Sequence, residues 1–158
     1  MSLEELAFLA QIISAIAVVA SLAFVGFQLS KATAAIRASS SQAHSSLYTD
    51  LVRSIIDNDD FARVWSIGLD DPKSLKQHEW VRFVAYSSAL FRLYESSRVQ
   101  WLNGRLDEEH WRTIERQAGD FGRMPGLKAA WALRGHWYSP EFRQWFENLA
   151  PSGELGPY

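Results

Sequence analysis

The residues of this sequence that could carry chemistry are few and scattered. The four histidines are His44, His78, His110 and His136. No two of them stand four residues apart, the spacing at which one face of a helix offers two imidazoles to a metal ion. The absence of Cys excludes thiolate catalysis and Cys-ligated zinc or iron–sulfur sites. The sequence also contains no Gly-x-Ser-x-Gly elbow and no phosphate-binding loop, so we expect no enzyme activity, no metal and no cofactor.

Glu95 and Arg98 are the charged residues whose position most suggests a role. Both fall on the aromatic side of a helix expected over residues 74–102, and Arg98 lies at almost the same helical angle as Trp80. Because an unpaired charge inside a protein is costly, the sequence predicts a buried pair between Glu95 and Arg98, with Arg98 also contacting an aromatic ring. The alternative is a polar spot in a pocket that receives a ligand or a partner's side chain.

A second candidate lies near the C-terminus, where basic and aromatic residues cluster. Its members are Arg134, His136, Trp137, Tyr138 and Arg143. Because Trp, Tyr and Arg are enriched at interface hot spots, we expect these residues to form an exposed recognition patch. The alternative is that the aromatic residues only fill the core between short helices.

The elements that position these side chains are helices, and the first differs in composition from the rest. No charged residue occurs between Glu5 and Lys31, although the chain has 16 basic and 18 acidic residues. As a helix, residues 6–29 would be roughly 36 Å long, more than a hydrocarbon core of about 30 Å. The acidic start and the long apolar run are untypical of a cleaved signal peptide. We therefore expect an uncleaved signal anchor, with a buried helix of a soluble protein as the alternative.

The basic residues around this segment predict its orientation. Lys31 and Arg37 follow it, whereas no Lys or Arg precedes it. Because positive residues stay on the cytoplasmic side, we expect the N-terminus outside and the C-terminal domain in the cytoplasm. The expected location is the bacterial inner (plasma) membrane.

Small and polar residues form a stripe along the apolar segment. Alternating steps of four and three residues give Ala10, Ser14, Ala17, Ser21, Phe24 and Gln28. Small residues let a second helix approach closely, and Ser or Gln can hydrogen-bond across the contact. We expect this stripe to bind a second copy of the chain or another membrane protein, the alternative being that it reflects an Ala- and Ser-rich composition. It could instead line a homo-oligomeric pore through Ser14, Ser21 and Gln28, although Phe24 stands in line with them.

The rest of the chain is typical of an all-α protein, a single transmembrane helix that continues into a small cytoplasmic bundle of about five helices. The Asp-rich run 57–60 should end one helix and cap the next, which carries Phe61, Val64 and Trp65. Asn103-Gly104, Asp107 and Ser139-Pro140 predict further helix ends and starts, and a turn is expected over 119–126. The predicted divisions are 1–5 (extracytoplasmic), 6–29 (transmembrane), 30–46 (helical extension), 47–149 (cytoplasmic helical domain) and 150–158 (polar tail after a stop at Pro151).

Three stretches of this sequence resemble an uncharacterised bacterial family. They are Phe91–Glu95, Asn103–Trp111 and His136–Arg143, together with the apolar span and the Gln-, Arg- and Ala-rich stretch after it. The resemblance covers most of the chain and implies one N-terminal membrane helix and a cytoplasmic helical domain. It implies no activity, cofactor or catalytic residue.

The net charge of −2 gives no general attraction for nucleic acid, which we do not expect as a partner. The function expected is therefore non-enzymatic. Self-association, or a place as an accessory subunit in a larger membrane complex, is the leading hypothesis, with membrane lipid and membrane proteins as partners. A membrane-tethered ligand sensor using Glu95 and Arg98 is the alternative, and the sequence does not identify its ligand.

Overall fold

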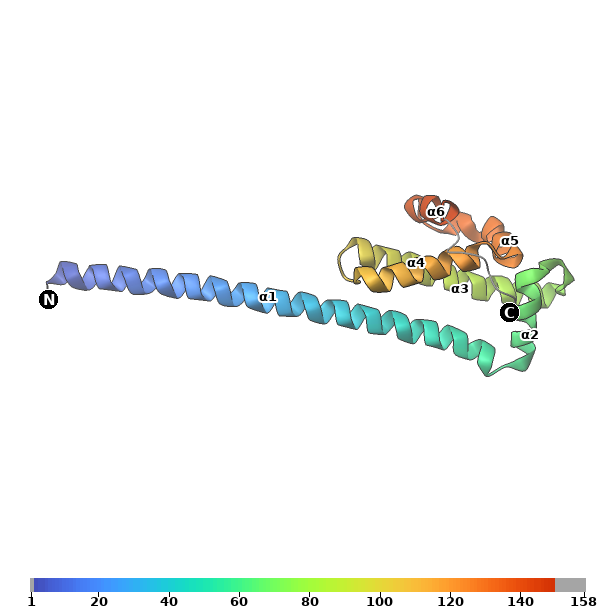
Figure 1. The fold of residues 1–158 in the computed structure, drawn as a ribbon, viewed down its shortest axis with the longest axis horizontal. Helices are drawn as coiled ribbons and strands as arrows, with labels where there is room; N and C mark the ends of the chain where they lie inside the picture. The colour runs from blue at the N-terminus through green and yellow to red at the C-terminus, as the bar shows by residue number, and fades with distance from the viewer. Residues whose placement is uncertain (1, 150–158) are drawn as a thin grey trace. The chain divides into compact units, whose positions relative to one another are not determined.

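The computed structural model of the protein describes residues 2–149, and over this range the regular structure is entirely helical. The all-α prediction is confirmed to that extent (Figure 1). The polar tail 150–158 and the stop predicted at Pro151 lie outside the described residues. In chain order the elements are α1 (Leu3–Ile56), α2 (Asp59–Asp70), the 3-10 turn η1 (Pro72–Ser74), α3 (Gln77–Leu102), α4 (Glu108–Gly122), α5 (Pro125–Arg134), the 3-10 turn η2 (Gly135–Trp137) and α6 (Pro140–Glu147).

Helix α1 begins with a reciprocal capping box. The Ser2 backbone N–H donates to the Glu5 carboxylate at 2.8 Å, and the Glu5 N–H donates to the Ser2 hydroxyl at 3.3 Å. No Pro interrupts the residues that follow, and α1 ends at Ile56, directly before the Asp-rich run 57–60. The chain divides into two compact units, residues 1–38 and residues 39–158. We call the described part of the second unit, residues 39–149, the helical domain.

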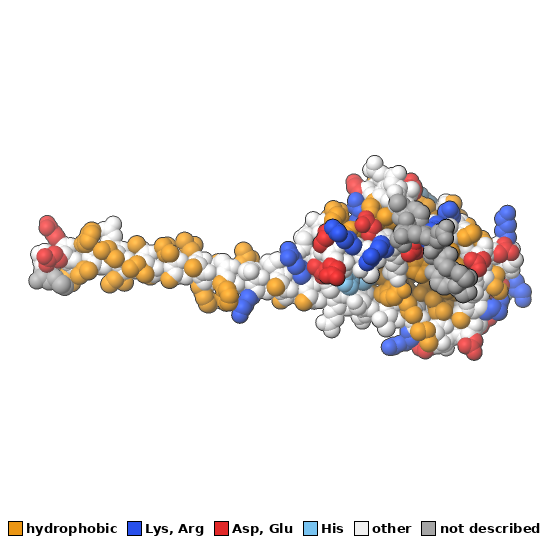
Figure 2. Space-filling view, viewed as in Figure 1, with side chains coloured by type: hydrophobic (Ala, Val, Ile, Leu, Met, Phe, Trp, Pro, Cys, Tyr) orange, Lys and Arg blue, Asp and Glu red, His pale blue; other side chains and the backbone are white. Residues whose placement is uncertain are grey.

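The part of α1 in the first unit has an uncovered apolar surface. Every residue from Leu3 to Ala38 is exposed, including Leu22 and Leu29 at 67% each. Figure 2 shows hydrophobic side chains along this part of α1, between the acidic residues at its start and the first basic side chains. By length and composition, α1 contains one segment that could cross a membrane.

Helix α3 is the centre of the helical domain. Its aromatic side packs against α2, α4 and α5, and α4 runs beside it after the turn at Asn103 and Gly104 (Figure 1). The last turns of α1 also lie against α3, where His44 approaches Ser97. The largest side chains with almost no exposure are Phe83, Phe91, Tyr94, Trp111, Leu127 and Phe142.

The helix ends follow local sequence signals. Gly104 has φ of +67°, the left-handed conformation that Gly adopts without strain, and its N–H donates to the Trp101 carbonyl at 2.8 Å. The predicted stop there is confirmed, as are three predicted caps. Each cap accepts the backbone N–H of the residue three positions later: Asn58 (2.9 Å), Asp107 (2.8 Å) and Ser139 (3.3 Å).

Two helix boundaries differ from the prediction. Helix α3 begins at Gln77 rather than near residue 74, because Pro72–Ser74 form a 3-10 turn and the Glu79 carboxylate accepts the Lys76 N–H at 2.8 Å. The turn expected over 119–126 is shorter, since α4 continues to Gly122. The last turn of α4 places the Phe121 ring near the Trp65 ring, with 6.4 Å between the two ring centroids.

Helices α2 and α5 cross in close contact at two glycines. A Cβ atom built on Gly126 would lie 1.7 Å from the Gly68 carbonyl oxygen, and one on Gly68 would lie 2.4 Å from the Phe83 ring. Neither residue ends a helix. A side chain at position 126 would separate the two backbones, and one at position 68 would collide with the Phe83 ring.

We expect Gly126→Ala to destabilise the helical domain by about 1–3 kcal/mol, because the added methyl group overpacks the crossing. Helix propensity alone predicts the opposite sign, since Ala is better than Gly by about 1 kcal/mol inside a helix. Urea unfolding of the full chain in detergent micelles, followed by Trp fluorescence, measures the difference. Lys128→Ala, at an exposed position of the same helix, is the control, and a stabilised Gly126→Ala would contradict the close crossing.

Candidate functional site

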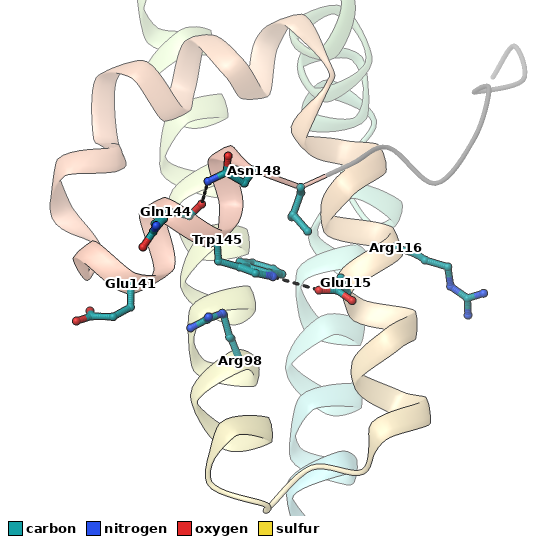
Figure 3. Close-up of a pocket in the computed structure, with 8 residues that line it drawn as sticks. Arg98, Glu115, Arg116, Glu141, Gln144, Trp145 and Asn148 are labelled. Atoms are coloured by element: carbon teal, nitrogen blue, oxygen red, sulfur yellow. Dashed lines mark hydrogen bonds between the residues drawn. The ribbon is translucent and has the colours of Figure 1, made fainter.

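A hollow in the helical domain lies between α3, α4 and α6 (Figure 3). Its volume is about 590 Å³, within the range of small-molecule sites. Helix α3 supplies one arginine, α4 supplies a glutamate and a second arginine, and α6 with the residues after it supplies the rest. The lining residues are Arg98, Glu115, Arg116, Glu141, Gln144, Trp145, Asn148 and Leu149.

Arg98 is a partly buried cation without an acidic partner among the described residues. Its guanidinium lies 5.6 Å from the centroid of the Trp145 ring, and its Nε is buried without a hydrogen bond. Within residues 2–149, Arg98 makes no ion pair and no side-chain hydrogen bond. Figure 3 shows its side chain below the Trp145 indole, at the wall of the hollow. Nε is therefore closed off, and the terminal Nη groups of Arg98 are the donors left available to an anion from outside the domain.

Trp145 is the fixed wall of this hollow. Its indole Nε1 donates to the Glu115 carboxylate at 3.2 Å, which joins α6 to α4 (Figure 3). Its ring also contacts the rings of Trp111 and Phe142, each with a centroid separation of 5.3 Å. These contacts hold both the indole and the Glu115 carboxylate in place beside Arg98.

The predicted pair between Glu95 and Arg98 does not form, and this corrects the expectation. Glu95 is buried as expected, but its carboxylate pairs with Arg92, and it accepts the Ser139 backbone N–H at 2.9 Å. Arg92 reaches it from the exposed side of α3, while its guanidinium lies 4.6 Å from the centroid of the Tyr138 ring. The Arg92 guanidinium and the Ser139 N–H both bind the Glu95 carboxylate. Arg98 contacts the Trp145 ring instead. The predicted cation–π contact of Arg98 is therefore present without the ion pair.

The predicted recognition patch is divided between surface and interior. Its five residues are Arg134, His136, Trp137, Tyr138 and Arg143. Trp137 is 51% exposed. The Arg134 guanidinium lies 4.0 Å from the centroid of its ring, and the centroid of the exposed His136 ring lies 5.9 Å away. Tyr138 is buried instead, because its hydroxyl donates to the Ser88 carbonyl at 2.8 Å. Arg143 is partly buried, so the exposed part of the patch is centred on Trp137.

Trp137 also borders a shallow groove of about 360 Å³ between α3 and α5. Val81 and Leu133, which line it, are 61% and 46% exposed. Arg134 is the charged residue of the lining. The groove therefore has the composition of a protein contact, an apolar floor with Trp and Arg beside it.

Two histidines that are 66 positions apart in the sequence, and that were not predicted to meet, lie together in the domain. His44 of α1 is buried at 6% exposure, and its ring lies 5.3 Å from the ring of His110 in α4, at nearly a right angle. His44 Nδ1 is 2.6 Å from the Ser97 hydroxyl, which donates to the Leu93 carbonyl at 2.8 Å. Because a hydroxyl has one proton, the imidazole Nδ1–H is the donor to Ser97. Within residues 2–149, no group of three or more metal-ligating side chains comes together here or elsewhere.

The buried position of His44 changes its protonation. Burial, and to a smaller extent the nearby His110, lowers its pKa from 6.5 to about 4. Asp107, which caps α4, also lies close by, and its pKa is lowered mainly by the His110 backbone N–H. One signal in the sequence could have located His44, since it precedes Tyr48, Leu51 and Ile55 at steps of four, three and four residues. That spacing places all four on one face of α1.

The residues of the predicted membrane-helix interface all lie on the exposed surface of α1. Ala10, Ser14, Ala17, Ser21 and Gln28 have no contact partner within the first unit. On a straight helix, positions repeating every seven residues drift by about 20° per heptad, so the stripe turns by about 50° from Ala10 to Gln28. The stripe is therefore a shallow left-handed band, and Phe24 lies within it.

Comparison of the chain with protein-family models, with curated proteins and with solved structures found no match in any of the three. The resemblance to a family of small bacterial membrane proteins therefore stays a prediction.

We expect the helical domain to lose stability through His44 as the pH falls from 6.5 toward 4. The unfolded chain binds a proton at His44 near pH 6.5, whereas the folded chain does so only near pH 4, so protonation favours unfolding between those values. The loss between pH 7 and pH 5 is about 2 kcal/mol. Urea unfolding of the full chain at both pH values should show this loss for the unmodified protein and a smaller one for His44→Gln. His136→Gln, at an exposed histidine, is the control, and an unchanged pH dependence in His44→Gln would contradict the burial of a neutral His44.

Proposed function

We propose that the chain is a non-enzymatic, single-pass membrane protein that acts by assembly, with itself or as an accessory subunit of a larger membrane complex. The observation that carries this proposal is the uncovered surface of α1 from Leu6 to Leu29, which has no charged residue and no neighbour in its own unit. An apolar surface of this length needs an apolar environment. A lipid bilayer supplies it, and every backbone group of the segment is already hydrogen-bonded within the helix.

The orientation proposed has the N-terminus outside and the helical domain in the cytoplasm of a bacterial plasma membrane. Lys31 and Arg37 support it, since they directly follow the apolar segment, and Glu4 and Glu5 precede it. The Lys31 ammonium lies 4.7 Å from the centroid of the Phe27 ring, so the first cation and the last aromatic residue of the segment stand together at one end. A first cation directly after the apolar segment fits a membrane–water boundary at that end.

The stripe from Ala10 to Gln28 is the surface proposed to bind another membrane helix. Lipid tails are as apolar as Leu side chains, so helices associate in a bilayer through close packing and polar contacts. Ala17 permits close packing, and the Ser14 and Ser21 hydroxyls can donate across the contact. The left-handed drift of the stripe favours a partner helix that crosses at about +20°.

The domain contributes a separate surface to the proposed assembly, the exposed Trp137 with Arg134 and the groove beside them. Trp137 offers a large ring for a partner to cover, and Arg134 is already stacked on it. Truncating residues of this kind at protein interfaces often costs 2 kcal/mol or more of binding free energy, on the order of a thirtyfold change in affinity.

A membrane-tethered ligand sensor is the second candidate function. The observation that favours it is the hollow of about 590 Å³ that opens onto Arg98, which has no ion-pair partner among residues 2–149. A half-buried arginine with free donors is a point where a small anionic group would bind. For the third alternative, a pore lined by Ser14, Ser21 and Gln28, no observation in the described residues adds support, and Phe24 stands within that lining.

We expect Leu substitutions at Ser14, Ala17 and Ser21 together to lower helix association by roughly tenfold or more, because bulky side chains prevent close packing and remove two hydroxyls. A bacterial two-hybrid assay in membranes, with the full chain on both partners, measures association. The matched control carries Leu at Ile12, Ile16 and Val19, which lie on the opposite side of α1.

Equal association of both triple variants with the unmodified chain would contradict the stripe as an interface. Loss of the protein from the membrane fraction in either variant must be measured in parallel, since a failed insertion would mimic failed association. The proposal of assembly itself fails if gentle extraction from native membranes yields a monomer without a partner, as determined by the mass of the intact particle.

A further inference from the structure

We propose that the hollow between α3, α4 and α6 binds a small zwitterion with the chemistry of an α-amino acid, whose carboxylate pairs with Arg98. This rests on the ligand-sensor candidate, for which the sequence suggested no ligand. The two Nη groups of Arg98 form a planar fork of donors that matches a carboxylate, and no side chain within residues 2–149 accepts a hydrogen bond from them.

The charges around the hollow favour a ligand without net charge. Its lining contains two arginines, Arg98 and Arg116, and two glutamates, Glu115 and Glu141, so its formal charge is +2 − 2 = 0. A simple anion would satisfy Arg98 but leave the carboxylates without a cation. A zwitterion pairs with both kinds of group, and its ammonium belongs near Glu141, since the Glu115 carboxylate already accepts the Trp145 indole N–H.

The two glutamates also disfavour ligands that carry additional negative charge. Each extra negative charge on a ligand would face a carboxylate within a small space, where like charges repel. Glu115 cannot easily turn away, because its carboxylate accepts the Trp145 indole N–H at 3.2 Å. Nucleotides, polyphosphates and other polyanions are therefore poor ligands for this hollow.

Trp145 supplies the apolar surface that a zwitterion also needs. Its ring lies between Arg98 and Glu115 (Figure 3). The ligand backbone can rest on the indole face, and its ammonium gains a cation–π contact there. The hollow is bordered by exposed side chains, among them Glu141, Gln144 and Asn148, so the ligand stays partly hydrated. We expect a dissociation constant between about 10 µM and 1 mM, which corresponds to a few well-formed contacts.

The test is isothermal titration calorimetry on the full chain in detergent micelles. The probes are the twenty common α-amino acids, each titrated separately, followed by sodium acetate, methylammonium chloride and inorganic phosphate as probes with a single charged group. Arg98→Gln removes the carboxylate partner, and Arg112→Gln is the matched control, because Arg112 is an exposed arginine of α4 that pairs with Glu108 outside the hollow. Urea unfolding of both variants verifies that the domain stays folded.

The expected result is saturable binding of at least one amino acid, weakened at least tenfold by Arg98→Gln and unchanged by Arg112→Gln. A second variant, Glu141→Gln, should weaken the amino acid but leave acetate unaffected. If acetate or phosphate binds at Arg98 as tightly as every amino acid, the zwitterion proposal is overturned while the ligand-sensor candidate stands. If no probe binds, or if Arg98→Gln binds as tightly as the unmodified chain, both are overturned.

Discussion

The helical domain depends on one requirement of α3, that an aromatic helix face carrying two charges be covered. Helices α2, α4 and α5 pack on this face, the Phe91 ring meets Phe146 of α6 at 5.3 Å, and His44 of α1 meets Ser97. Covering aromatic area stabilises the domain, whereas covering Glu95 or Arg98 without a partner would cost more than a ring contributes. Glu95 and Arg98 are accommodated in different ways. Glu95 is enclosed and receives Arg92 and the Ser139 N–H, while Arg98 stays beside water, with Trp145 as its only ring contact in the described residues.

The helices were predictable because their signals are local. Asn58, Asp107 and Ser139 cap from within the same turn that they begin, and Gly104 ends α3 through its own φ angle. Contacts that depend on residues distant in the sequence were predicted less well. Two residues three positions apart in a helix can pair, but Glu95 has such a neighbour on both sides, and the choice of Arg92 depends on where Ser139 lies. The approach of Gly68 to Gly126 joins residues 58 positions apart, and nothing in either local sequence indicates the other.

The contact between His44 and Ser97 was not predicted, because the residue on α1 that makes it is not apolar. The apolar residues Leu51 and Ile55 predict the buried face of the last turns of α1, and continuing their spacing backward leads to Tyr48 and then His44. Histidine is not an apolar residue, so hydrophobicity alone places the start of that face later in the chain. In the domain, the face is continued by a polar contact, the imidazole N–H to the Ser97 hydroxyl, and this contact is satisfied only while His44 is neutral. The buried face of α1 therefore extends at least one turn further toward its N-terminus than hydrophobicity alone indicates.

The three surfaces proposed for binding differ in composition, and each composition suits a different kind of partner. The stripe on α1 consists of small side chains, and such a surface is useful only where another helix can pack closely against it. The groove beside Trp137 has apolar side chains and one arginine, which suits a protein partner that excludes water. The hollow at Arg98 has balanced charges and one fixed ring, which suits a small hydrated molecule better than a protein surface. No residue belongs to two of these sets. A substitution in one set can therefore be interpreted without assuming an effect on the other two, as long as the core around α3 remains folded.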